Sequence, residues 1–245
     1  MGNQCLGNLR PLLAAPDERV RLHAARCMLS LGGDEALETL RRIAMDSSSA
    51  LRLEALEAAA ASARHSDSAL LARKLLDDGD IQVRLAAYEN LRQGEDVAIT
   101  QEFIGRTFYL EHIVQSSRKL IYVSRSGQPR VVLFGEPISC HDGIFVESLD
   151  GDVTINAAVG QSQATIVRKH PKRPEVVAQA QSSLDLAYII RVLCQEPSKG
   201  GDKGGGLGVS YADLAMLLKQ MCDKGAVEAE FHAGPLPKIS PNIKK

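Results

Sequence analysis

Nearly the same phrase occurs three times within the first ninety residues of the chain. Its central arginines are Arg21, Arg52 and Arg84, so the repeat has a period of 31 to 32 residues. A repeat of this length, built from helical segments, is typical of a stacked solenoid, in which each unit buries its apolar face only against its neighbours. Solenoids mostly present binding surfaces. The copies are Asp-Glu-Arg-Val-Arg-Leu-His-Ala-Ala at 17–25, Ser-Ala-Leu-Arg-Leu-Glu-Ala at 49–55 and Asp-Ile-Gln-Val-Arg-Leu-Ala-Ala at 80–87.

Short polar breaks divide this region into amphipathic helices. Pro16 disfavours helix in the residue before it, and Asp17 offers an N-cap carboxylate to the next helix. Gly32-Gly33 can close that helix, while Asp78-Gly79-Asp80 reads as a turn followed by another cap. Gly94 marks the end of the pattern. We therefore predict a helical domain over residues 1–95, with about two and a half helix pairs.

The repeated phrase resembles the HEAT family, in its short bacterial form with Asp-x-x-Val-Arg-x-x-Ala-Ala followed by Leu-Gly or an equivalent. The resemblance covers residues 10–93. The second copy departs from it, since Ser48 and Ser49 replace the acidic start and Leu51 replaces valine. The resemblance implies that the acidic residues and arginines link neighbouring repeats and are not catalytic. The residues concerned are Asp17, Arg21, Arg52, Asp80 and Arg84.

The second half of the chain has the sequence pattern of short antiparallel strands. Asp150-Gly151 is a strong turn signal, and Ser126-Gly127-Gln128-Pro129 separates two apolar runs. No βαβ spacing is present, so parallel pairing is not expected. The candidate strands are 107–114, 120–123, 131–134, 143–148, 153–157 and 164–167.

Residues 171–174 interrupt the strand pattern, and a helix with apolar positions from Leu184 to Leu193 is predicted to follow. Residues 198–206 have the composition of a flexible connector. A second helix is predicted from Tyr211 to Cys222, capped by Ser210, and 226–232 alternates like a strand. The fold class is therefore α+β: a short HEAT-like α-solenoid, then a β-rich domain closed by two helices and a final strand. The predicted domains are 1–95, 103–233 and a flexible tail, 234–245.

This last unit resembles the C-terminal end of the bacterial flagellar P-ring protein. The matching segments are 184–193, 208–221 and 224–230, with Leu207-Gly208 and Asp213-Leu214 at corresponding places. A long glycine-rich insertion replaces the tight turn of that family, and the family's long β-rich body and secretion signal are not seen here. The resemblance implies a non-enzymatic ring subunit that encircles the flagellar rod in the periplasm. It implies packing roles for Asp213, Leu214, Leu217 and Leu218.

Cys140-His141-Asp142 invites interpretation as a nucleophile beside a base. Adjacent residues of an extended chain point to opposite faces, however, and catalytic pairs are usually formed by residues far apart in sequence. We interpret the segment as a turn between strands. The other thiols, including Cys27 within an apolar helical pattern, are predicted to be buried or inert. No catalytic residue is therefore assigned.

No metal-binding or phosphate-binding pattern stands out. The six histidines have no short paired spacing, and the five cysteines contain no Cys-x-x-Cys pair. The glycine connector lacks the Gly-Lys-Ser/Thr ending of a P-loop, since Gly204 follows Lys203. The basic cluster at 170–174 is interpreted as a solvated loop. We predict no cofactor-binding and no metal site.

The charge balance argues against a nucleic-acid partner. The chain has 29 basic and 30 acidic residues and a net charge of −1, without the basic excess of such binders. No apolar run approaches the ~18–20 residues of a membrane span, so no membrane insertion is predicted. The start, Met1 to Leu6, does not read as a secretion signal, although this does not exclude a longer secreted protein.

Two functional hypotheses remain. The first is a non-enzymatic structural protein of the flagellar basal body, which self-associates into a P-ring-like assembly and is periplasmic. The alternative is a soluble, cytoplasmic HEAT-repeat adaptor that binds a protein or peptide partner. Both predict protein partners and no enzymatic activity.

Overall fold

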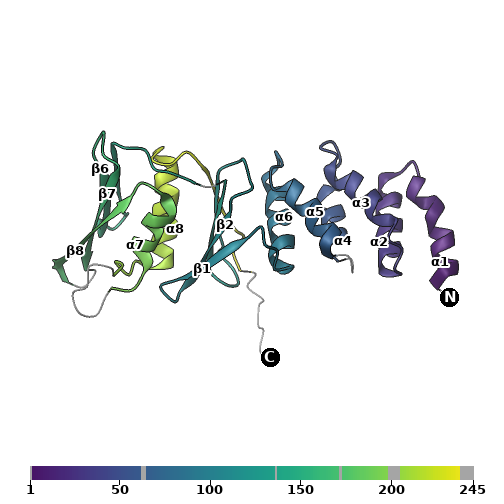
Figure 1. Ribbon diagram of the computed structural model, residues 1–245, viewed down its shortest axis with the longest axis horizontal. Coiled ribbons are helices and arrows are strands. Elements are labelled where there is room, and N and C mark those ends of the chain that lie inside the picture. The colour runs from purple at the N-terminus through teal and green to yellow at the C-terminus, as the bar shows by residue number, and fades with distance from the viewer. Residues whose placement is uncertain (1, 62–64, 136, 171–172, 198–204, 238–245) are drawn as a thin grey trace, which may run out of the picture. The chain divides into compact units, whose positions relative to one another are not determined.

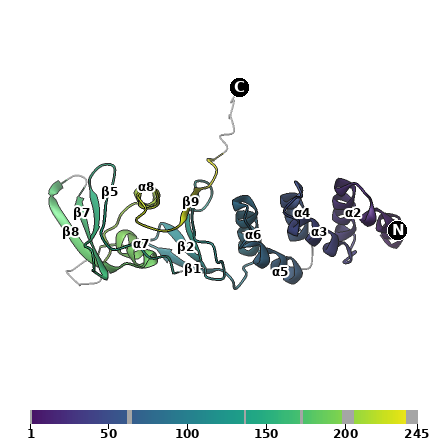
Figure 2. The same ribbon diagram turned by 90° about the horizontal axis from the view of Figure 1, so that it is seen from above.

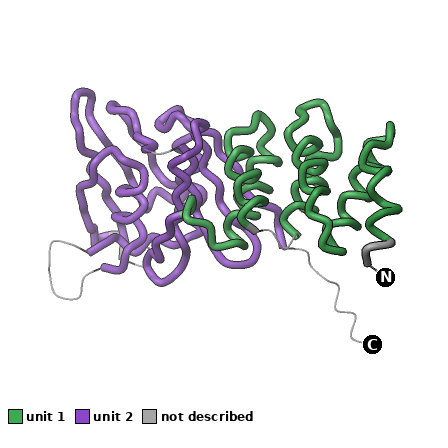
Figure 3. The backbone as a smooth tube through the Cα atoms, turned by 45° about the vertical axis from the view of Figure 1, so that its right-hand side comes forward, with its two compact units in different colours: residues 1–99 green, residues 100–245 purple. Residues whose placement is uncertain are grey.

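A computed structural model describes residues 2–61, 65–135, 137–170, 173–197 and 205–237. The chain divides into two compact units, Met1–Ile99 and Thr100–Lys245 (Figure 3). The first is helical, and the second contains two sheets, two helices and a final strand. This confirms the predicted α+β fold.

Unit 1 is built from antiparallel helices in two rows. Figure 2 shows α2, α4 and α6 in one row and α3 and α5 in the other. The helices are α1 (Gly2–Leu9), a 3-10 helix (Arg10–Ala14), α2 (Glu18–Ser30), α3 (Ala36–Met45), α4 (Arg52–Ala60), α5 (His65–Leu75) and α6 (Ile81–Gln93).

The repeated phrase starts α2, α4 and α6, which explains why these helices form the same row. Asp17 caps α2 by accepting a hydrogen bond from the backbone N–H of Arg19, and Asp80 caps α6 through that of Gln82. In the divergent second copy, Ser49 Oγ instead accepts the backbone N–H of Leu51 at 3.1 Å. The serine thus performs a related local role where the acidic residue is missing.

Unit 2 contains a five-stranded sheet in the order β1-β2-β4-β3-β9 and a four-stranded antiparallel sheet in the order β5-β6-β7-β8. Within the first sheet, β2 pairs with β4, and β3 with β9, in parallel. The strands are β1 (Thr100–Ile104), β2 (Phe108–Ile113), β3 (Leu120–Val123), β4 (Arg130–Phe134), β5 (Ile144–Glu147), β6 (Val153–Ala157), β7 (Gln163–His170), β8 (Arg173–Ser183) and β9 (Glu230–Ala233).

The sequence prediction of this unit was wrong in three respects. Two strand pairs are parallel, because β9 returns from the end of the chain and β4 lies beside β2 as well as β3. The strand β1 was missed. The strand β8 was also missed, since residues 175–179 are exposed on both faces and give no clear alternation. Residues 171–172, 198–204 and 238–245, parts of the predicted break, connector and tail, lie outside the described residues.

Two helices lie between the sheets of unit 2, α7 (Leu186–Cys194) and α8 (Tyr211–Asp223) (Figure 1). Both sheets and both helices share one apolar core. Asp185 caps α7 through the backbone N–H of Ala187, and Ser210 caps α8 through that of Asp213. The two ends of the connection between these helices lie together, because the backbone N–H of Gly206 donates to Glu196 O at 3.1 Å.

Candidate interaction surface

One ion pair joins successive repeats of unit 1. Arg52 Nη1 donates to Asp78 Oδ1 at 3.0 Å, its Nη2 binds Asp78 Oδ2, and its Nε donates to Ala44 O at 3.0 Å. The hydrogen bond to Asp78 raises the pKa of Arg52, although burial opposes it. Arg52 is thus the predicted link between repeats, but its carboxylate partner here is Asp78.

The other repeat arginines also have structural positions. Arg21 Nη1 donates to Ala15 O at 2.8 Å and to Pro16 O at 2.9 Å, which fastens the loop before α2. Arg84 is almost entirely buried. Ser49 Oγ donates to Glu18 Oε2 at 2.7 Å, a contact between residues one repeat apart.

A second paired contact fastens the end of the array. Arg73 Nε donates to Asp96 Oδ1 at 3.0 Å, and Arg73 Nη2 donates to Asp96 Oδ2 at 2.8 Å. Burial would raise the pKa of Asp96, but the hydrogen bonds from Arg73 and from the backbone N–H of Ala98 outweigh burial and lower it. Two hydrogen bonds hold Arg73 and Asp96 together, and both residues line the cavity beside them.

Two cavities on the surface of unit 1 share lining residues. One, of about 680 Å³, lies among the start of α5, the end of α6 and the loop after it. The other, of about 170 Å³, lies between α4 and α6. Ala60, Asn90 and Gln93 line both, and we call the two cavities together the Asn90 groove. Val97, at the rim, is 83% exposed.

The Asn90 groove contains an unsatisfied donor and an excess of carboxylates. Asn90 Nδ2 is buried without a hydrogen-bond partner among the described residues. A buried amide donor that lacks a partner is costly, so such a group calls for an explanation. Glu57 and Glu95 line the groove, and neither forms an ion pair with the other described residues.

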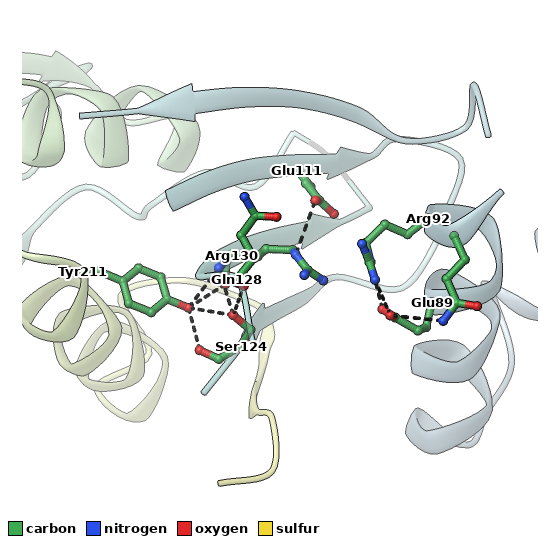
Figure 4. Close-up of polar contacts among 8 residues, drawn as sticks. Glu89, Arg92, Glu111, Ser124, Gln128, Arg130 and Tyr211 are labelled. Carbon is green, nitrogen blue, oxygen red and sulfur yellow. Dashed lines mark hydrogen bonds and ion pairs between the residues drawn. The ribbon is translucent and has the colours of Figure 1, made fainter. Parts of the chain in front are cut away.

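Glu89, a further acidic residue that lines the groove, forms an ion pair with Arg92 of the same helix, α6. Glu89 accepts a hydrogen bond from Arg92 Nε at 3.0 Å, and Gln93 Nε2 lies 3.5 Å from Glu89 Oε1 (Figure 4). Glu57 and Glu95 therefore dominate the charge that the groove presents. A donor beside uncompensated carboxylates suits a ligand that offers carbonyl oxygens and positive charge.

The structure separates the residues of Cys140-His141-Asp142. Cys140 is 5% exposed and its backbone N–H donates to Leu184 O, while His141 points to solvent. Burial raises the pKa of the Cys140 thiol to about 12, so the thiolate is disfavoured. Asp142 Oδ2 accepts the backbone N–H of Gly160 at 2.7 Å. The segment is not a simple turn, since Cys140 forms a β-bridge with Val227.

Of the thiols predicted to be buried or inert, only some are buried. Cys194 is buried and Cys222 is half-buried, and burial raises their pKa values to about 12 and about 11. Cys5 and Cys27 are exposed. Cys27 follows Ala24 and Ala25 in the sequence, but the helical rotation turns it away from the core face. Within the described ranges, no three His, Cys, Asp or Glu side chains gather as a metal site would require.

A half-buried tyrosine, Tyr211, connects α8 to the five-stranded sheet. Tyr211 Oη lies 2.7 Å from Ser124 O and 2.8 Å from Arg130 O, and it accepts the backbone N–H of Arg130 at 3.2 Å (Figure 4). Along the same helix, Leu214, Leu217 and Leu218 lie in the core. Asp213 lies at the start of the helix, where Ser210 Oγ donates to its carboxylate at 2.7 Å.

Residues 7–92 match the family model of HEAT repeats. No curated protein and no solved structure matches the chain. The N-terminal unit is thus a HEAT-repeat region. HEAT repeats generally mediate protein–protein interaction and are typically non-catalytic. None of the described helices is both long and apolar enough to cross a bilayer.

Sequence reasoning located the repeat arginines but missed the groove. Arg73 and Asp96 lie outside the repeated phrase and belong to no short motif, and Asp78 was noted only as part of the turn before Asp80. Asn90 gave no signal either, because a single asparagine inside a helical pattern is uninformative until its neighbours in space are known. Its importance comes only from the two cavities that it lines.

Proposed function

We propose that this chain is a non-enzymatic interaction protein whose HEAT-repeat unit binds a basic, extended segment of a partner protein in the Asn90 groove. The observation that carries the proposal is that Asn90 lines both cavities while its Nδ2 is buried without an acceptor among the described residues. A rotation of the Asn90 side chain towards the groove would let a backbone carbonyl of a bound segment supply that acceptor. Lysine or arginine side chains of the same segment would meet Glu57 and Glu95.

Selection of binding peptides from a random library displayed on phage tests this proposal with the full chain as bait. Enriched peptides should carry Lys or Arg, and their binding should weaken at high salt because exposed charges are screened. Asn90→Ala should weaken their binding without lowering stability, since it removes an unsatisfied group. Asn8→Ala, a matched change on the exposed face of α1, should leave binding unchanged. Binding that Asn90→Ala leaves intact would refute the assignment.

A second candidate function follows the resemblance of the C-terminal unit to the flagellar P-ring protein. In this reading the chain is a basal-body component in the periplasm and self-associates into a ring around the rod. The supporting observation concerns the insertion between the helices. The backbone N–H groups of Leu207 and Val209 donate to Val192 O and Leu193 O, both at 2.8 Å, so the chain returns to the end of α7 despite the insertion. Helix, turn, helix, Gly225 and strand β9 then follow as in the family's order.

Fractionation of source cells tests this second candidate directly. An antibody raised against the chain should detect a band in purified basal bodies or in the periplasm, with a larger band wherever a longer precursor exists. A band confined to the cytosol would reject the basal-body role. That outcome would leave the groove proposal standing, because the groove lies entirely in unit 1.

A further inference from the structure

The outermost strand of the four-stranded sheet is long and has one open side. The strand β8 spans 11 residues and pairs only with β7 among the described strands. Figure 1 shows it at the outer border of its sheet. We refer to residues 175–183 as the β8 edge. Most of its side chains are exposed, including Val177 at 56%, whereas Ser182 is buried.

The hydrogen-bond pattern shows which main-chain groups face the open side. The backbone N–H of Lys169 donates to Asp152 O at 2.7 Å, so odd-numbered residues of β7 bond towards β6. Even-numbered residues of β7 therefore bond to β8, where Arg168 opposes Ala178 and Ile166 opposes Ala180. The N–H and C=O groups of Val177, Gln179 and Gln181 consequently point away from the sheet.

The strand β8 begins with Arg173 and Pro174, but residues 175–183 have few of the features that usually protect an open strand. Glu175 is the one ionisable residue of this β8 edge, which contains no lysine and no proline. The other edge strands in the described sheets are four or five residues long, and on β1 the carboxylate of Glu102 is held by Arg191 at 2.7 Å. Natural sheets protect long edges by charge, proline or shortness, so an unprotected edge is a template for strand addition.

We propose that the β8 edge pairs with the same edge of a second copy of this chain. Length favours this occupant, because β8 is the one described edge strand long enough to satisfy the outward groups of another β8. Charge also permits it. In an antiparallel pairing centred on Gln179, Glu175 faces Ser183 and Val177 faces Gln181, so no like charges oppose each other.

This pairing is isologous, since each copy contributes the same surface, and it closes at two copies. The four-stranded sheets of the two copies become one continuous sheet. The inference rests on neither proposed function, because it uses no residue of the Asn90 groove and predicts a dimer, not a ring.

Sedimentation velocity of the full chain over a concentration series tests the pairing. The wild type should convert from monomer to dimer as concentration rises. Gln179→Pro removes one outward N–H without removing a bond to β7, and proline is tolerated where a strand's N–H faces solvent. It should raise the dissociation constant by about tenfold or more. Gln101→Pro is the matched control. Tyr109 N–H bonds towards β4, so Gln101 on β1 also points outward, and this variant should dimerise normally.

Hydrogen exchange supplies a second measurement that does not depend on any variant folding. Amides of residues 175–183 should become protected as concentration rises, while those of β1 should not. A wild type that stays monomeric at every concentration would overturn the proposal. So would an assembly of any size that survives Gln179→Pro, or protection that appears elsewhere and spares the β8 edge.

Discussion

At the scale of single residues, two ion pairs of unit 1 connect segments that lie apart in the sequence. Arg52, Asp78, Arg73 and Asp96 each make paired, partly buried contacts. The net attraction within such a pair stabilises the fold little, but removing one partner leaves the other buried without a hydrogen-bond partner, which is costly. Substitutions that remove a single member should therefore reveal them most clearly.

Asp78→Asn should lower the free energy of unfolding by about 1–3 kcal/mol, because the Arg52 guanidinium would keep only part of its acceptors. Chemical denaturation followed by circular dichroism measures this loss. Asp46→Asn is the matched control. Asp46 is exposed, its side chain hydrogen-bonds only to Ser48, and its electrostatic interaction with Arg52 is weak, so the loss in this variant should stay within about 0.5 kcal/mol. Equal losses in both variants would contradict the inter-repeat role.

Asp96 should make stability depend on pH in acid. Its pKa is lowered in the folded protein by Arg73 and by the Ala98 backbone N–H, against the effect of burial. Its contribution is therefore present above the unfolded-state pKa and is lost as pH falls through the folded-state pKa. The stability difference between wild type and Asp96→Asn should be largest near neutral pH and shrink in acid. Glu95→Gln, the exposed neighbour, should show a much smaller difference, and a gap independent of pH would refute the argument.

At the scale of elements, the sequence predicted the features that depend on neighbouring residues: helix starts, helix caps and hairpin turns. The repeated phrase begins three helices of one row, and Asp17, Asp80 and Ser210 cap helices as expected. The hairpins β3–β4 and β5–β6 are confirmed at the predicted turns. These features depend on residues close together along the chain.

The pairing of strands with distant partners was not predictable. Strands near β9 and β4 were predicted, but not that β9 pairs with β3, more than a hundred residues earlier, or that β4 pairs with β2. The strand β8 lacks alternation because consecutive side chains, those of residues 175–179, are exposed on both of its faces. For the same reason, the Asn90 groove was not anticipated, since Ala60 and Asn90 approach each other only when α4 packs against α6.

Two glycines in left-handed turns should respond differently to alanine. Gly105, at φ +52°, joins β1 to β2, and a Cβ there would lie 2.2 Å from Cys194 O. Gly127, at φ +68°, has no atom within 4 Å of that position. Gly127→Ala should cost about 1–2 kcal/mol from backbone strain alone, and Gly105→Ala should cost distinctly more. Thermal unfolding of both variants provides the comparison, and equal costs would contradict the packing of β1–β2 against α7.

At the scale of the whole molecule, the chain combines a HEAT-repeat unit with a second unit built on two sheets. Repeat units of this kind offer extended surfaces for binding. All the proposed functions are therefore interactions between proteins. A partner segment binds in the Asn90 groove, a second copy pairs with the β8 edge and, in the second candidate function, copies of the chain assemble into a ring.

The most direct test of the interaction account is a quantitative pull-down from source cells with three tagged versions of the chain. Wild type and Asn8→Ala should recover the same partner in the same amount, whereas Asn90→Ala, folded to the same extent by circular dichroism, should lose it. Equal recovery of every partner by all three versions would contradict the claim that unit 1 binds through this groove.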